Sequence, residues 1–91
     1  MHILVAESAE TDFTSIRDYF GQRNPVASDL MLARITATAE LLATHPRVGH
    51  LGRVRGTREL VVTRTPFVLV YTLTEQTLTI VRVLHVRRQW P

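Results

Sequence analysis

With 91 residues, of which 45% are apolar, the chain is long enough for one globular domain, residues 1–91, with a modest core. It has no cysteine, which excludes disulfide bonds, thiolate zinc sites and a cysteine nucleophile, and no stretch near the ~20 apolar residues of a membrane span. Its net charge of +3 is unevenly placed, because residues 1–45 carry three Arg and six acids, whereas residues 46–91 carry eight Arg and two acids.

The positive charge of the second half comes entirely from arginine, and the chain contains no lysine. Arginine suits planar, bidentate contacts with phosphate or carboxylate groups. The distribution therefore indicates an acidic partner for residues 46–91, either a nucleic acid or an acidic protein segment, with a merely solvated basic face as the alternative. The first residues lack the basic start and long apolar stretch of a signal peptide, so we expect a cytoplasmic location without membrane contact.

The first half of the chain predicts one strand and two helices. His2–Ala6 is a short apolar run that predicts a strand pairing with the sheet edge. Ser8 is the predicted N-cap of a helix over about Ala9–Gln22. Asn24 is the predicted N-cap of a second helix, which starts with a proline and continues to about Thr44. Two consecutive helices with a short link predict an antiparallel hairpin lying across the sheet.

The second half predicts a basic loop followed by three strands. Residues 47–56 hold three of the four glycines and three arginines, without the spacing of a phosphate-binding P-loop. The runs Thr57–Thr63, Phe67–Leu73 and Leu78–His85 have short connections, which predict an antiparallel meander. The middle run is apolar at nearly every position, which is typical of a central strand covered on both faces. The predicted fold class is α+β, β-α-α-β-β-β, with a small antiparallel meander sheet packed on a helical hairpin.

Hydrolysis or phosphoryl transfer is one chemistry that the basic half suggests. His85 is a candidate general acid or base, with a strand-end histidine that has a satisfied hydrogen bond as the alternative. Glu59 is the sole carboxylate candidate in the basic region, and strand alternation favours an ion-pair partner over a base. The arginines that could converge on a phosphodiester are Arg53, Arg55, Arg58, Arg64, Arg82, Arg87 and Arg88.

Neither a metal site nor a cofactor is expected. His45 and His50 flank a loop that has no carboxylate at ligand spacing nearby. The serines at the chain's helices and helix cap give no support to a serine nucleophile. Trp90 and Tyr71 are candidates for stacking on bases, with packing in the protein as the alternative.

Four segments of the chain are informative both in their residues and in the order in which they occur: Leu42–Gly49, Gly56–Val62, Phe67–Tyr71 and Ile80–Pro91. In this order they resemble the RelE/ParE superfamily of bacterial type II toxins, and the resemblance covers essentially the whole chain. It implies a small curved sheet packed on a helical hairpin. It also implies a cognate antitoxin, whose DNA-binding half carries a flexible and often acidic tail that wraps the toxin.

The implied antitoxin agrees with an acidic partner for the basic half, and the two helices would offer it apolar grooves. Promoter DNA would be bound only through the antitoxin, and the pair would act as a plasmid stabilisation, or addiction, module. The residues predicted to bind the antitoxin are Phe13, Ile16, Tyr19, Phe20, Leu30 and Arg34.

The target of the toxin divides the superfamily. RelE-like members cut mRNA on the ribosome, whereas ParE-like members poison DNA gyrase. Thr63 and Val68 stand where RelE-like and YoeB-like toxins have a catalytic arginine, while Arg88 and His85 lie at or near C-terminal catalytic positions. The RelE-like C-terminal tyrosine has no counterpart, so the nuclease set is at best half present.

The resemblance therefore favours a ParE-like inhibitor of DNA gyrase that is not an enzyme. Its predicted target-binding residues are Arg53, Arg55, Arg58, Arg82, Arg87, Arg88 and Trp90. The alternative is a ribosome-dependent mRNA endoribonuclease, in which His85 acts as acid or base and Arg58, Arg82 and Arg88 neutralise phosphate.

Overall fold

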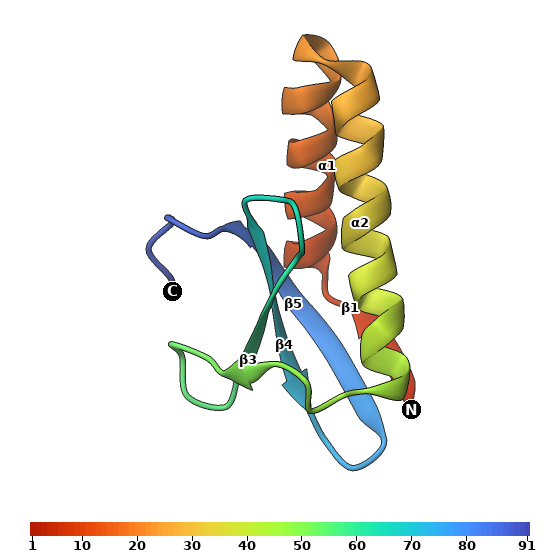
Figure 1. Ribbon diagram of the computed structural model, residues 1–91. Helices are drawn as coiled ribbons and strands as arrows, with labels where there is room; N and C mark the ends of the chain where they lie inside the picture. Colours follow the sequence, from red (N-terminus) through yellow and green to blue (C-terminus); the bar gives the residue numbers. More distant parts are fainter.

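The computed structural model describes residues 1–91 and has the predicted α+β architecture, with two helices against one face of a sheet (Figure 1). The predicted element order is confirmed apart from one additional short strand, β2, inside the predicted loop at residues 47–56. The elements are β1 (His2–Val5), α1 (Glu7–Arg23), α2 (Pro25–Thr44), β2 (His50–Leu51), β3 (Arg58–Val61), β4 (Phe67–Leu73) and β5 (Thr77–His85).

The five strands form one sheet in the order β1-β5-β4-β3-β2, with β4 at its centre as predicted. β4 pairs antiparallel with both β3 and β5, and its residues from Phe67 to Tyr71 are all buried. β1 lies at the edge, where it was expected, but it runs parallel to β5, so the sheet is mixed rather than purely antiparallel. β2 forms the other edge by pairing with β3.

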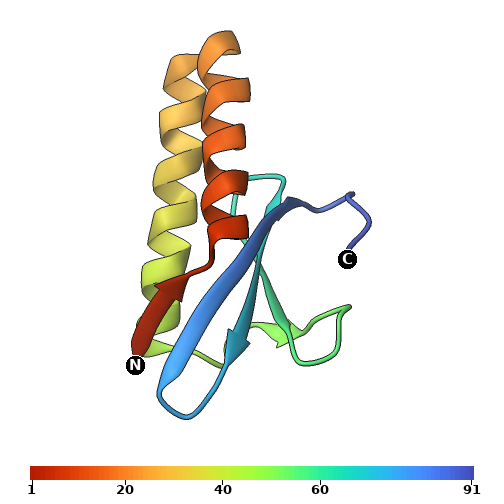
Figure 2. The same cartoon turned by 180° about the vertical axis from the view of Figure 1, so that it is seen from behind.

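β5 contains a bulge at the middle of its pairing with β4. Arg82 lies opposite Val70 and Ile80 lies opposite Tyr71, so Val81 is the extra residue. β1 pairs with β5 only as far as Ile80. Beyond the bulge, β5 therefore continues without a strand on its outer side, and α1 takes that place (Figure 2).

The start of α1 differs from the prediction. The N-cap is Ala6, which makes no side-chain cap hydrogen bond, so the predicted cap at Ser8 is wrong. The reason is that β1 turns directly into the helix while the Ala6 N–H still bonds to the Ile80 carbonyl of β5. The Ser8 hydroxyl, now inside the first turn, donates to the Val81 carbonyl at 2.6 Å.

The start of α2 follows the prediction. The Asn24 side chain accepts a hydrogen bond from the Ala27 N–H at 3.1 Å, and Pro25 occupies the first helical position. The helix ends at Thr44, as expected. Neither helix is long and apolar enough to cross a membrane.

The core has two unequal parts, one on each face of the sheet. On the face away from the helices, Val68, Val70 and Leu84 form a small cluster, and Trp90 of the C-terminal tail packs against it. The large part lies between the sheet and the lower half of the helical hairpin and consists of Ala9, Ile16, Ile35, Leu42, Val62, Phe67, Leu69, Tyr71, Leu78, Ile80 and Val83. The tip of the hairpin projects beyond the sheet.

Candidate functional site

The arginines proposed for phosphate binding do not converge on one site. The Arg58 guanidinium donates from Nη1 to the Gly49 carbonyl at 2.8 Å and so supports the loop that follows α2. The Arg82 guanidinium forms a two-point ion pair with Asp12 of α1, at 2.7 Å from Nε and 2.9 Å from Nη2. Both side chains are therefore engaged by the protein itself, on different parts of the sheet.

The Asp12–Arg82 pair closes the open edge of β5. One Asp12 oxygen, Oδ2, also accepts from the Val83 N–H at 2.9 Å, which supplies the hydrogen bond that a neighbouring strand would otherwise make. The hydrogen bond and charge of Asp12 raise the pKa of Arg82 against the opposing effect of burial, so the Arg82 guanidinium stays charged. Asp12 of α1 therefore completes the hydrogen bonding of β5 as well as pairing with Arg82.

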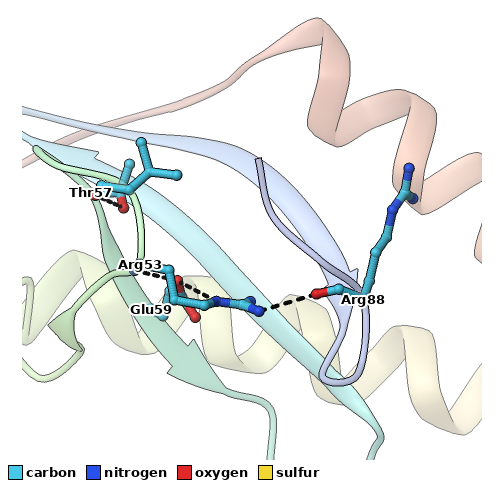
Figure 3. A network of polar contacts seen from close by, with 5 residues as sticks. Arg53, Thr57, Glu59 and Arg88 are labelled. Carbon is cyan, nitrogen blue, oxygen red and sulfur yellow. Dashed lines mark hydrogen bonds and ion pairs between the residues drawn. The ribbon is translucent and has the colours of Figure 1, made fainter.

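A second network joins the Gly-rich loop at residues 47–56, β3 and the C-terminal tail (Figure 3). The Glu59 carboxylate accepts from Arg53 twice, at 2.9 Å from the backbone N–H and at 3.2 Å from Nε. The same guanidinium donates from Nη1 to the Arg88 carbonyl at 3.0 Å. Glu59 is 5% exposed, so it is the ion-pair partner that strand alternation favoured and not a free base.

Burial raises the pKa of the Glu59 carboxyl, but the hydrogen bonds from Arg53 and the positive charges of Arg53 and His50 outweigh it, and the net pKa lies below its ordinary 4.5. A carboxyl whose pKa is lowered by folding stabilises the protein above the unfolded pKa and loses that contribution as the pH falls through the folded pKa. The ion pair of Glu59 with Arg53 should therefore stabilise the folded protein at neutral pH, and this stabilisation should be lost in acid, when the carboxyl is protonated.

The Glu59→Gln variant should lose about 2 kcal/mol of unfolding free energy at neutral pH, because a buried charged hydrogen bond is replaced by a neutral one. Urea denaturation should show this difference shrinking as the pH falls through the lowered pKa of the folded carboxyl, where the wild-type side chain becomes protonated. Glu75→Gln, in the exposed β4–β5 turn, is the matched control and should change little at any pH. A difference for Glu59→Gln that stays constant into acid would contradict the assignment.

His85 and Arg88, the other two candidates, lie together on a groove of about 590 Å³ between α1 and the end of β5. The His85 Nδ1 accepts the Arg87 N–H at 3.1 Å, and its ring meets Phe67 edge to face, with 6.0 Å between centroids. The Arg88 side chain extends toward α1 and makes no hydrogen bond within the protein (Figure 3). The α1–β5 groove is lined by Asp12, Ser15, Ile16, Tyr19, Phe20, Phe67, Val83, His85 and Arg88.

The C-terminal tail is anchored by Trp90 and not free to stack on a base. The indole packs against the cluster on the helix-free face, and the Arg82 guanidinium lies 5.4 Å from its ring centroid. Its Nε1 is buried without a hydrogen-bond partner. Of the predicted target-binding set, only Arg55, Arg87 and Arg88 present exposed guanidinium groups without an internal partner.

The residues predicted to bind an antitoxin are divided between core and surface. Phe13, Ile16 and Phe20 pack into or against the helix-facing core, whereas Tyr19 and Leu30 are about half exposed. The remaining member, Arg34, donates to the carbonyl of Arg64 in the β3–β4 turn at 3.2 Å. A second hollow, of about 500 Å³, lies between the two helices and the sheet and is lined by eight hydrophobic residues, Phe13 among them.

Sequence reasoning missed Asp12 and Ser15 as neighbours of His85 and Arg88. Both lie on one face of α1 with Ile16, Tyr19 and Phe20, at helical spacing. Ile16 and Tyr19 are each four residues after one of these polar positions, so extending the helical spacing by one turn toward the N-terminus would have found Asp12 and Ser15.

Comparison with known proteins agrees with this structure. A sequence model described as the ParE toxin of type II toxin-antitoxin system, parDE, matches residues 3–90. The chain is 40% identical over 80 residues to Toxin RelE2 of Caulobacter vibrioides, covering 88% of this chain and 89% of that protein. It is 34% identical over 73 residues to the toxin Y4kP of Sinorhizobium fredii, covering 80% of this chain and 75% of that protein.

A solved structure of the chromosomal ParDE TA system from P. aeruginosa has the same fold, with a TM-score of 0.83 at 20% sequence identity, covering 93% of this chain and 95% of that chain. The fold and these matches together define a small protein toxin of the RelE/ParE superfamily. More closely, the chain belongs to the ParE toxin family of type II toxin–antitoxin systems.

Proposed function

We propose that this toxin arrests growth by binding and inhibiting DNA gyrase and that it has no nuclease activity of its own. The observation that carries the proposal is that two of the three arginines of the nuclease alternative, Arg58 and Arg82, are bonded to groups of the toxin itself, which leaves only Arg88 available. An endoribonuclease needs its acid, base and charge-stabilising groups within hydrogen-bond reach of one phosphodiester.

The separation of the nuclease candidates along the sheet supports the same proposal. Arg58 is paired with Tyr71 and His85 with Phe67, four residues apart on β4. At about 3.3 Å per residue, the two are offset by roughly 13 Å along the strand direction, and they also lie on opposite sides of β4. His85 has no carboxylate that orients its ring. Glu59, the carboxylate candidate of the basic region, is held by Arg53 in the network that joins residues 47–56, β3 and the C-terminal tail.

The surface left for a target is the basic end of the molecule. Arg87 and Arg88 follow β5 directly. This segment is held against the sheet by the hydrogen bond from Arg53 to the Arg88 carbonyl (Figure 3) and by the packing of Trp90. A preordered basic segment loses little conformational entropy when it meets an acidic or phosphate-bearing surface. Gyrase in complex with DNA offers both kinds of surface.

The test combines two assays of the same chain. Purified toxin should inhibit DNA supercoiling by gyrase and accumulate cleaved DNA, and RNA 5′-end mapping within minutes of induction should show messages without codon-phased cuts. Arg88→Ala should weaken the inhibition only several-fold, as expected for one contact at a binding surface. Codon-phased cuts that disappear in both His85→Ala and Arg88→Ala would overturn the proposal in favour of the ribosome-dependent nuclease.

We further propose that a cognate antitoxin, encoded beside the toxin, neutralises it in the cytoplasm, and that promoter DNA is bound only through the antitoxin. The basic half of the chain supports a partner with an acidic segment. The hollow between the two helices and the sheet, lined by Val5, Phe13 and Ile35 among others, offers apolar surface for the same partner.

A further inference from the structure

The β3–β4 turn, residues 62–66, contains the only residue other than glycine whose backbone has a positive φ. This residue is Arg64, with a φ of 64°. The left-handed conformation crowds the Cβ atom, so it suits glycine, and among the other residues asparagine and aspartate adopt it most readily. A glycine would therefore fit this turn with less strain than the arginine does. Strain of this kind at an exposed arginine points to a role of its side chain outside the fold.

The turn is held in this conformation by contacts that do not use the Arg64 side chain. The Thr65 hydroxyl donates to the Val62 carbonyl at 2.9 Å and accepts the Phe67 N–H at 3.1 Å. From α2, Arg34 donates through Nη1 to the Arg64 carbonyl at 3.2 Å. The Arg64 guanidinium is exposed and makes no hydrogen bond or ion pair within the protein, so its charge is available to a ligand.

The β3–β4 turn lies beside the start of the C-terminal tail. The Val86 N–H donates to the Pro66 carbonyl at 2.8 Å, which ties the tail to the turn. Both views of the molecule show the turn and the tail at the same end of the sheet (Figures 1 and 2). Arg64 therefore belongs to the same basic end of the molecule as Arg87 and Arg88.

Four arginines from three separate segments make up this end, which we call the terminal arginine patch. They are Arg34 of α2, Arg64 of the β3–β4 turn, and Arg87 and Arg88 of the tail. The three ion pairs of the protein involve other residues, so none of the four has a counter-ion. Arginines without counter-ions that come from several elements suit a series of phosphates along a nucleic-acid backbone.

We propose that Arg64 binds a phosphate of the DNA that gyrase holds, and that the terminal arginine patch follows the backbone of that DNA. The inference rests on the function proposed above, the inhibition of gyrase, and makes DNA part of the target. Arg64 projects from a turn that is already fixed, so binding orders little more than its own side chain. Charged residues are depleted at the centre of protein–protein interfaces, whereas phosphate contacts gather arginines, and this favours DNA over an acidic protein surface.

Replacing Arg64 by glycine separates the side chain from the turn. Arg64→Gly removes the left-handed strain, so its urea midpoint should equal or exceed that of wild type. Arg47→Gly, at an exposed position without a positive φ, is the matched control. Its midpoint should fall, because glycine there only adds freedom to the unfolded chain. A clear fall for Arg64→Gly would mean that the side chain supports the fold, which overturns the inference.

Binding to a fluorescently labelled DNA duplex at low salt measures the phosphate contact directly. Arg64→Gly should weaken binding by about threefold to tenfold and should lower the slope of log affinity against log salt by about one. Arg47→Gly removes the same charge beside Arg58, at the other end of the sheet, and should change the affinity by less than about twofold. Equal effects of the two variants, or no duplex binding by the wild type, would overturn the inference.

Inhibition of gyrase separates this inference from the proposed function. Arg64→Gly should need about tenfold more toxin for half-inhibition of supercoiling than wild type does. Equal inhibition by the two would overturn the inference and leave the gyrase function standing. A wild-type toxin that binds duplex through Arg64 but does not inhibit gyrase would keep the phosphate contact and remove the gyrase function. If Arg64→Gly weakens binding to gyrase without DNA as much as to gyrase with DNA, the partner is an acidic protein surface and the DNA assignment is overturned.

Discussion

Replacing Asp12 by alanine is expected to lower the free energy of unfolding by about 3 kcal/mol. The change leaves the Arg82 guanidinium, 21% exposed, without its ion-pair partner, and it leaves the Val83 N–H at the sheet edge without an acceptor. A domain of this size is stabilised by only about 5–15 kcal/mol in total, so the loss is large. Urea denaturation of the purified chain at neutral pH measures it.

The same helix supplies the control. Asp18 pairs with Arg17 at 3.8 Å, and both side chains are more than half exposed. Asp18→Ala should therefore change stability by less than about 0.5 kcal/mol. Comparable losses for the two variants would mean that α1 responds to any lost acid and that the contact with β5 is not the cause.

A double-mutant cycle isolates the pair itself. Arg82→Met keeps the aliphatic stem and removes the charge, so the combination of Asp12→Ala with Arg82→Met no longer contains an unpaired guanidinium. The double variant should be more stable than the sum of the single losses predicts, by about 1–3 kcal/mol. Strict additivity would show that Asp12 acts on β5 through the Val83 N–H alone.

Replacing Tyr71 by phenylalanine is the second change with a large expected effect, a loss of about 2–4 kcal/mol. The fully buried hydroxyl donates to the Pro46 carbonyl at 2.7 Å and accepts the Gly49 N–H at 3.0 Å. Removing one oxygen atom leaves two backbone groups of the loop after α2 without partners. Each buried polar group left unsatisfied costs about 1–3 kcal/mol.

Tyr19→Phe is the matched control, because Tyr19 is 54% exposed and its hydroxyl makes no hydrogen bond within the protein. It should leave the urea midpoint nearly unchanged. Gly49→Ala tests the same contact from the other side, since a Cβ there would lie 2.6 Å from the Tyr71 hydroxyl. A Tyr71→Phe variant as stable as wild type would indicate that water replaces the hydroxyl in this loop.

These two positions hold parts of the basic half of the chain in place. Asp12 fixes the outer edge of β5 just before His85 and the basic tail. Tyr71 and Arg58 both bond to the loop after α2, and Arg53 connects the Gly-rich loop to the tail. Part of the positive charge that suggested a phosphate-binding surface therefore stabilises the fold.

The sequence by itself determined the parts of this protein that depend on local interactions. The second helix begins after Asn24 and ends at Thr44, as predicted, because an N-cap and the proline at position 46 act on their own chain neighbours. The central strand Phe67–Leu73 was predicted with its correct bounds, since a strand covered on both faces is apolar throughout. The resemblance to the RelE/ParE superfamily was likewise carried by contiguous segments.

The tertiary structure alone decided which charged residues remain available to a partner. Asp12 and Arg82 are 70 residues apart in sequence, and they meet only because β1 stops at Val5 and leaves the edge of β5 to α1. Ser8 serves that edge and not its own helix for the same reason. β2 is two residues long, too short for any periodic pattern, and it exists only because β3 offers it an edge. Hydrogen bonds between distant segments depend on how the layers pack, and no local pattern in the sequence reports that packing.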